Sequence, residues 1–205
     1  MSSDRPGVAP SAEPDLAALL KARGAPLVEA LEAHLPGSRA HAAATGSYAF
    51  AVSVELSFDR SQCEVAREAA VLHEVGLVYV SAATLAKAAS DRDESEIATV
   101  DSHYEAGYKL ARGAGIPEHV CRWLVRVRER FDGRGPEGLA GEQIPLESRL
   151  IRVSCLAASA LARAEGGGEP AHREAIVALE RASATELDPR LVAILSEVLT
   201  RAATA

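Results

Sequence analysis

Apolar residues recur every three to four positions from Asp15 to the end of this 205-residue chain, and no other feature constrains the fold as strongly. The pattern begins with Leu16, Leu19 and Leu20 and returns in most later segments. A period near 3.6 residues places such side chains on one face of a helix. Only 4% of the residues are aromatic, whereas strands favour aromatic and β-branched side chains. The sequence therefore predicts an all-α fold.

Glycine, proline and charged turns divide this pattern into helices. A break over Gly24 to Pro26 predicts two short helices at the start of the periodic region. The run GLVYVSAATL is the only β-like segment, and we expect it to be a loop pressed onto the core. Gly166 to Gly168 predicts a flexible joint. The remaining helices are expected at about 40–57, 62–74, 96–113, 118–130, 146–163, 170–183 and 188–202.

The ends and the charge of the chain bound its organisation. Residues 1–13 are rich in Ser, Pro, Gly and Ala without periodicity, which predicts a disordered leader before a single domain over 14–205. The chain start lacks the apolar run of a signal peptide, and no apolar stretch is long enough to cross a bilayer. We therefore expect a cytoplasmic protein without a membrane partner. The net charge of −7 also argues against nucleic acid as the partner.

The segment ERFDGRGPEGLAGEQIPLESRLIRV, residues 129–153, is too specific to follow from composition. It resembles the GYP segment of HD-GYP proteins, bacterial enzymes that hydrolyse cyclic di-GMP. Upstream, AAVLHEVGLVYVS resembles the segment that carries the family's His-Asp pair, and SHYEAG resembles its His-Pro segment. The likeness covers about residues 26–200. It implies a helical bundle of the HD superfamily with additional C-terminal helices.

The resemblance also implies metal ligands, and several of them are changed in this chain. His41, His73 and His103 stand at ligand positions, while Glu74 and Cys155 replace two aspartates. A phosphodiesterase of this type uses bridged metal ions that lower the pKa of a water molecule until hydroxide attacks the phosphate.

Other changes remove further residues that the resemblance expects at the site. The family's paired histidines are Val127 and Arg128 here, its lysine is Leu77, and the tyrosine of the GYP motif is deleted before Pro136. A guanidinium keeps its proton at neutral pH and repels a cation at close range. We therefore expect no bridged multi-metal centre and no bound cofactor.

Three interpretations follow from this pattern. The leading one is a catalytically inactive HD-GYP-like protein that acts in bacterial signalling related to cyclic di-GMP, through other signalling proteins and as a monomer or homodimer. In another, a ligand sensor, a cyclic dinucleotide or phosphate binds without turnover. The residues expected to bind that ligand are Arg128, Arg130, Arg134, Gly135 and Pro136.

The runner-up to the leading interpretation is a residual phosphohydrolase that uses a single Zn, Fe or Mn ion. Its ligands would be His41, His73, Glu74 and Cys155, with His103 as a further candidate. The alternative for each of these candidate residues is a purely structural role.

In those roles His73 bonds to a backbone carbonyl or to Glu74, and Cys155 is a small core hydrophobe. Asp101 and Tyr104 would be the partners of His103. The arginines would form a solvated face paired with Glu118, Glu129 and Asp132.

Overall fold

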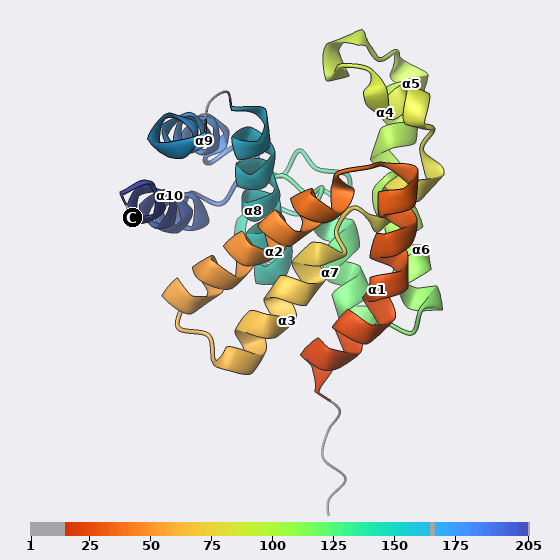
Figure 1. The fold of residues 1–205 in the computed structure, drawn as a ribbon, viewed down its shortest axis with the longest axis horizontal. Helices are drawn as coiled ribbons and strands as arrows, with labels where there is room; N and C mark the ends of the chain where they lie inside the picture. The colour runs from red at the N-terminus through yellow and green to blue at the C-terminus, as the bar shows by residue number, and fades with distance from the viewer. Residues whose placement is uncertain (1–14, 165–166, 205) are drawn as a thin grey trace, which may run out of the picture.

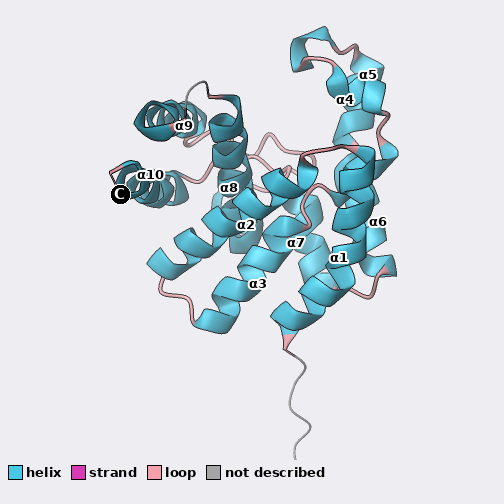
Figure 2. Cartoon of the chain, viewed as in Figure 1, coloured by secondary structure: helices cyan, strands magenta, loops and turns pink. Residues whose placement is uncertain are grey.

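The computed structural model describes residues 15–164 and 167–204 of the chain. The expected leader over 1–13 and the first glycine of the expected joint lie outside the described residues. Within the described ranges the chain forms helices, loops and two isolated bridges but no strand (Figure 2), which confirms the all-α prediction. The α-helices are α1 (Leu16–His34), α2 (Ser38–Glu55), α3 (Arg60–Val71), α4 (Ala82–Ala86), α5 (Glu94–Asp101), α6 (His103–Gly113), α7 (Glu118–Arg126), α8 (Leu146–Arg163), α9 (Gly168–Ala182) and α10 (Pro189–Ala203). Short 3₁₀ turns are η1 (Val75–Tyr79), η2 (Ala89–Asp91) and η3 (Gly141–Gln143).

Side-chain caps define several helix starts. The Asp59 carboxylate accepts from the backbone N–H of Gln62 at 2.8 Å, and the Gln62 amide oxygen accepts from the N–H of Asp59 at 2.9 Å. Asp93 and Glu96 form the same reciprocal pair at α5. Such capping boxes satisfy N–H groups that have no partner within the helix. They fix where α3 and α5 begin.

Helix α2 lies at the centre of the bundle, where it packs against α3 and α8 (Figure 1). The C-terminal helices α9 and α10 lie beside α8, on the opposite side of the molecule from α4 and α5. One continuous core joins α1, α2, α3 and α6 to α10, and its largest fully buried members include Leu20, Val52, Leu150 and Leu195. Because α2, α3 and α8 share this core, residues more than 80 positions apart in the sequence can meet between them.

The expected break over Gly24 to Pro26 is wrong, because α1 is one helix with Pro26 inside it. Gly24 is a packing position: a Cβ there would lie 2.5 Å from Cδ2 of Leu72. Close contact with the core therefore explains the glycine at position 24. The burial of one face of α1 compensates for the helix hydrogen bond that is lost at Pro26, which has no N–H group.

Three other expected elements differ from the structure. The helix expected at 96–113 is two helices, α5 and α6, which meet at Ser102. The helix expected at 118–130 ends at Arg126, so Glu129 lies in the following loop. The β-like run forms η1 and α4, because its apolar residues pack as a small cluster around Leu77 and Val80 instead of pairing with a strand.

Buried Glu129 holds the Gly-rich loop in place. Its side-chain oxygens accept from the backbone N–H groups of Glu137 at 2.8 Å and Leu139 at 3.1 Å. A Cβ on Gly135 would lie 2.6 Å from Glu129 Oε2. The loop thus surrounds the Glu129 carboxylate, and only 3% of the residue's surface is exposed. The expected role of Glu129 in a solvated face paired with arginines is therefore wrong.

Candidate functional site

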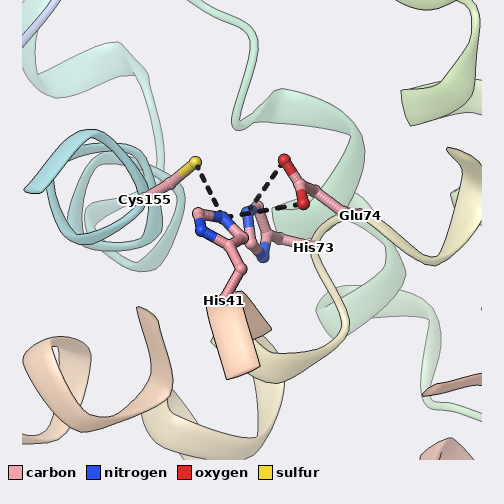
Figure 3. A group of neighbouring side chains, drawn as sticks. All are labelled: His41, His73, Glu74 and Cys155. Atoms are coloured by element: carbon pink, nitrogen blue, oxygen red, sulfur yellow. Dashed lines mark hydrogen bonds and ion pairs between the residues drawn. The ribbon is translucent and has the colours of Figure 1, made fainter. Parts of the chain in front are cut away.

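Four candidate ligands converge between three elements of the bundle (Figure 3). His41 comes from α2, His73 and Glu74 come from the link between α3 and η1, and Cys155 comes from α8. One ligand atom of each lies within 4.8 Å of the others. His41 Nε2 is 3.6 Å from Glu74 Oε2 and 3.7 Å from Cys155 Sγ, and His73 Nε2 is 3.7 Å from Glu74 Oε1. The described residues contain no other such group of three or more candidate ligands.

The orientation of His73 fits a metal ligand. Its Nδ1 is 2.8 Å from the Ala70 carbonyl oxygen and donates its proton there, which leaves the lone pair of the neutral imidazole on Nε2. Nε2 is buried, has no hydrogen-bond partner and faces Glu74. A backbone carbonyl that fixes the tautomer in this way is a common outer contact of histidines that bind metal. The four residues therefore fit one divalent ion.

His103 lies beside this group but outside it. Its Nδ1 donates to the Val100 carbonyl at 2.5 Å, and its ring centroid is 3.8 Å from that of Tyr104. The hydrogen bond expected with Asp101 is therefore wrong, since the partner is a backbone carbonyl. His103 Nε2 is buried without a partner, and burial lowers the pKa of this imidazole.

The residues present do not fit a bridged second ion. Val127 is a core residue with 1% of its surface exposed, and Leu77 is buried in the cluster with Val80. Arg128 Nη1 donates to the Asp101 carbonyl at 3.4 Å, so its positive charge lies near the start of α6. The two positions where the resemblance expects histidines thus supply a hydrocarbon and a cation.

A cleft of about 900 Å³ opens over this side of the molecule. Its charged lining combines four cations with three carboxylates. The cations are Lys109, Arg128, Arg130 and Arg152, and the carboxylates are Asp101, Glu105 and Glu186. Tyr79, Tyr104 and Pro136 add flat apolar surfaces. Fixed cations beside ring surfaces can bind a ligand that carries both phosphate and a planar base.

Arg152 and Glu186 are cleft residues that the sequence analysis missed. Arg152 Nη2 donates to Glu186 Oε2 at 2.7 Å, and Arg152 Nη1 lies 3.5 Å from the Tyr104 hydroxyl. Glu186 Oε1 is also 3.2 Å from Arg130 Nη1. Burial raises the pKa of Tyr104 to about 12, so its hydroxyl stays protonated at neutral pH. Glu186 follows Arg152 by 34 positions, and no motif in the sequence links the two.

Not all the residues expected to bind a ligand reach the cleft. Arg128, Arg130 and Pro136 line it, whereas Arg134 and Gly135 are not among its lining residues. Arg134 is exposed, and its backbone N–H donates to Asp132 at 3.1 Å. The role of all five in ligand binding stays a prediction.

Comparison with known proteins identifies the family of this chain. The HD domain description matches residues 26–191, which is most of the chain. The chain belongs to the HD domain family. Among curated relatives of this HD domain, the cyclic di-GMP phosphodiesterase response regulator RpfG of Xanthomonas campestris is 31% identical over 131 residues, 62% of the chain and 34% of RpfG. The 3′3′-cGAMP-specific phosphodiesterase 3 of Vibrio cholerae is 25% identical over 82% of the chain and 37% of the relative. The chain thus spans about a third of the length of these relatives.

Solved structures agree with this HD domain assignment at the level of the fold. Bd1817, an HD-GYP-type protein from Bdellovibrio bacteriovorus, superposes with a TM-score of 0.65 at 18% identity, over 80% of the chain and 52% of Bd1817. The HD domain of the L. monocytogenes phosphodiesterase PgpH superposes with a TM-score of 0.64 at 13% identity, over 87% of the chain and 97% of that domain. These findings confirm the predicted HD-GYP-like resemblance and the helical bundle. Among the described helices, none combines the length and the apolar character needed to cross a bilayer.

Proposed function

We propose that this HD-GYP-like domain binds a phosphate ester of the cyclic dinucleotide class in its cleft without hydrolysing it. The observation that carries this proposal is the position of Arg128, a cation that lines the cleft where the resemblance expects a metal-binding histidine. A guanidinium binds phosphate oxygens through paired, charge-assisted hydrogen bonds. Arg128 thus supplies positive charge to a ligand and generates no hydroxide.

The relatives support the ligand class. RpfG is named as a cyclic di-GMP phosphodiesterase, and the HD domain of PgpH has been solved in complex with cyclic di-AMP. A cyclic dinucleotide carries two phosphodiester charges and two planar bases. Lys109, Arg128 and Arg130 offer cations for the former, and Tyr79, with 69% of its surface exposed, offers a ring for the latter.

The signalling role in this proposal is a binding role. Because the ligand is not hydrolysed, the ligand-bound domain itself must be recognised by other signalling proteins or by a second copy of the chain. A fold can keep its site and lose its chemistry in this way.

Calorimetric titration of chelator-treated protein with cyclic di-GMP tests the proposal. We expect Arg128→Ala to weaken binding by about tenfold or more, because a charge-assisted hydrogen bond contributes about 1.5–3 kcal/mol. Arg122→Ala is the matched control, since Arg122 is an exposed arginine that pairs with Glu118 at 3.1 Å and does not line the cleft. Binding that is absent, or equal in both variants, contradicts the proposal.

A residual one-metal phosphohydrolase is the second candidate, because the four-residue group fits one ion. A bound ion would supply a Lewis acid and a water of lowered pKa. The chain's own contribution is the fixed tautomer of His73, which presents Nε2 to the ion.

Chromatographic analysis of cyclic di-GMP after incubation with Zn²⁺, Fe²⁺ or Mn²⁺ separates the two candidates. Metal-dependent product that disappears in His73→Ala establishes the second candidate and overturns the first. No product, with binding retained, leaves the non-hydrolysing role.

A further inference from the structure

Arg152 on α8 is a cleft cation whose hydrogen-bond donors are only partly used. Its Nη2 donates to Glu186 Oε2 at 2.7 Å, and its Nη1 reaches the Tyr104 hydroxyl at 3.5 Å. Its Nε is buried and has no hydrogen-bond partner. Arg130, by contrast, donates to both carboxylate oxygens of Asp132, at 3.1 and 2.9 Å. Among the described residues, Glu186 is thus the one carboxylate that pairs with Arg152.

The Glu186 carboxylate lies between two arginines, where an anion from outside could also bind. Oε2 pairs with Arg152, and Oε1 is 3.2 Å from Arg130 Nη1. A phosphodiester also shares one negative charge between two free oxygens, and a guanidinium binds either group through paired hydrogen bonds. Some 34% of the Glu186 side-chain surface is exposed, whereas its backbone carbonyl accepts from the N–H of Phe131 at 3.3 Å. The carboxylate can therefore leave the two arginines while the turn that carries it stays in place.

We infer that Arg130 and Arg152 form a second phosphate subsite of the cleft, which Glu186 fills as an internal anion when no ligand is bound. The inference rests on the proposed function, in which Arg128 binds one phosphodiester of the ligand. The second phosphodiester of a cyclic dinucleotide replaces the Glu186 carboxylate on the two arginines. One monovalent anion replaces another, so the charge balance around the two guanidinium groups does not change.

The second subsite determines which class of nucleotide the cleft prefers. A cyclic mononucleotide has a single phosphodiester and can fill only one of the two subsites. A cyclic dinucleotide can fill both, and it alone gains the contacts that Arg152 leaves unused. Arg152 is therefore a specificity-determining residue for ligands with two phosphodiester groups.

Calorimetric titration of the chelator-treated full chain with cyclic di-GMP and with cyclic GMP tests the subsite. Glu186→Gln is the reference chain, since removal of Arg152 alone would leave a carboxylate without its partner. We expect Arg152→Met/Glu186→Gln to bind cyclic di-GMP about tenfold or more weakly than Glu186→Gln, because hydrogen bonds to a charged group are lost. Affinity for cyclic GMP should change by no more than about twofold, because the Arg128 subsite stays open and separate sites act independently to within about that factor.

A second arginine–glutamate pair supplies the matched control. Arg201 and Glu55 pair between α10 and α2, and neither lines the cleft. Arg201→Met/Glu55→Gln should therefore bind cyclic di-GMP as Glu55→Gln does. Arg152→Lys/Glu186→Gln keeps the charge but loses the planar fork, so we expect an affinity between those of Glu186→Gln and Arg152→Met/Glu186→Gln. Thermal melting checks that each variant is folded, and Arg152→Lys/Glu186→Gln decides the test if the methionine variant is not.

The outcomes separate this inference from the proposed function. Unchanged affinity for cyclic di-GMP after loss of Arg152, or an equal loss for cyclic di-GMP and cyclic GMP, would overturn the second subsite. If Arg128→Ala still weakens binding in that case, the proposed function stands without it. If neither the natural chain nor Glu186→Gln binds cyclic di-GMP, the proposed function and the second subsite are both wrong.

Discussion

Gly76 lies where η1 passes against the first turns of α6. A Cβ at this position would be 1.9 Å from the carbonyl oxygen of His103 and 2.5 Å from the amide nitrogen of Gly107. Both atoms belong to the backbone, so a change of side-chain rotamer could not relieve the clash. The absence of a Cβ at Gly76 thus allows η1, which Glu74 immediately precedes, to lie against α6, which begins at His103.

We predict that Gly76→Ala lowers the free energy of unfolding by about 3 kcal/mol or more, at the upper end of overpacking effects. Urea denaturation followed by circular dichroism measures this. Gly113→Ala is the matched control, since a Cβ there meets nothing within 4 Å and alanine favours the helix. A loss no larger than that of the control would show that the two elements can separate at little cost.

At the residue scale, the resemblance predicted which side chains matter better than it predicted their surroundings. It named His41, His73, Glu74 and Cys155, and the structure brings these four together. Nothing in the sequence fixes the tautomer of His73, because its partner is a backbone carbonyl whose position depends on how α3 ends. The burial of Glu129 could not be predicted from the sequence either, because its partners are backbone N–H groups of the loop that follows.

At the element scale, the turn between α9 and α10 closes one side of the cleft. The backbone N–H groups of Phe131 and Asp132 donate to the carbonyls of Glu186 and Thr185, which ties this turn to the Gly-rich loop. The Glu186 carboxylate then lies between Arg130 and Arg152. A carboxylate that pairs with two cleft cations competes with an anionic ligand for them.

We therefore predict that Glu186→Gln strengthens binding of cyclic di-GMP severalfold, because the amide is isosteric and uncharged. The same calorimetric titration measures it at two salt concentrations, since screening weakens charge effects. Glu180→Gln on α9 is the control, because it removes a carboxylate that does not line the cleft. Weaker binding in Glu186→Gln would mean that the carboxylate positions Arg152 for the ligand and does not compete with it.

The elements themselves were predictable where local signals agreed. The expected helix at 146–163 matches α8, because a proline precedes it and its apolar period is unbroken. The break expected over Gly24 to Pro26 failed because a contact with Leu72, 48 positions later, decides the role of Gly24. The pairing of Arg152 with Glu186 was missed for the same reason, because the two residues lie 34 positions apart. Local propensity carries no information about which helix faces which.

At the scale of the whole molecule, one core joins α1, α3, α7, α8 and α10, so we expect these helices to unfold together. Cys121 on α7 belongs to this core, and its Sγ–H donates to the Ile116 carbonyl at 3.5 Å. Burial raises the pKa of its thiol from 9.0 to about 11. The thiol lies outside both the metal-ligand group and the cleft, so its ionisation reports on the fold alone.

The raised pKa predicts how stability falls in alkali. Well below pH 9 the Cys121 thiol is protonated in the folded and unfolded chains alike, so it makes the free energy of unfolding no more dependent on pH. As the pH rises from about 9 towards 11, the unfolded chain loses this proton while the folded chain keeps it, so the free energy of unfolding decreases. Cys121→Ser cannot ionise in this window but keeps a donor for the Ile116 carbonyl. Melting temperatures measured between pH 8 and 10.5 should therefore fall more steeply for the natural chain than for Cys121→Ser. Parallel curves would mean that α7 admits water to the thiol before the rest of the core unfolds.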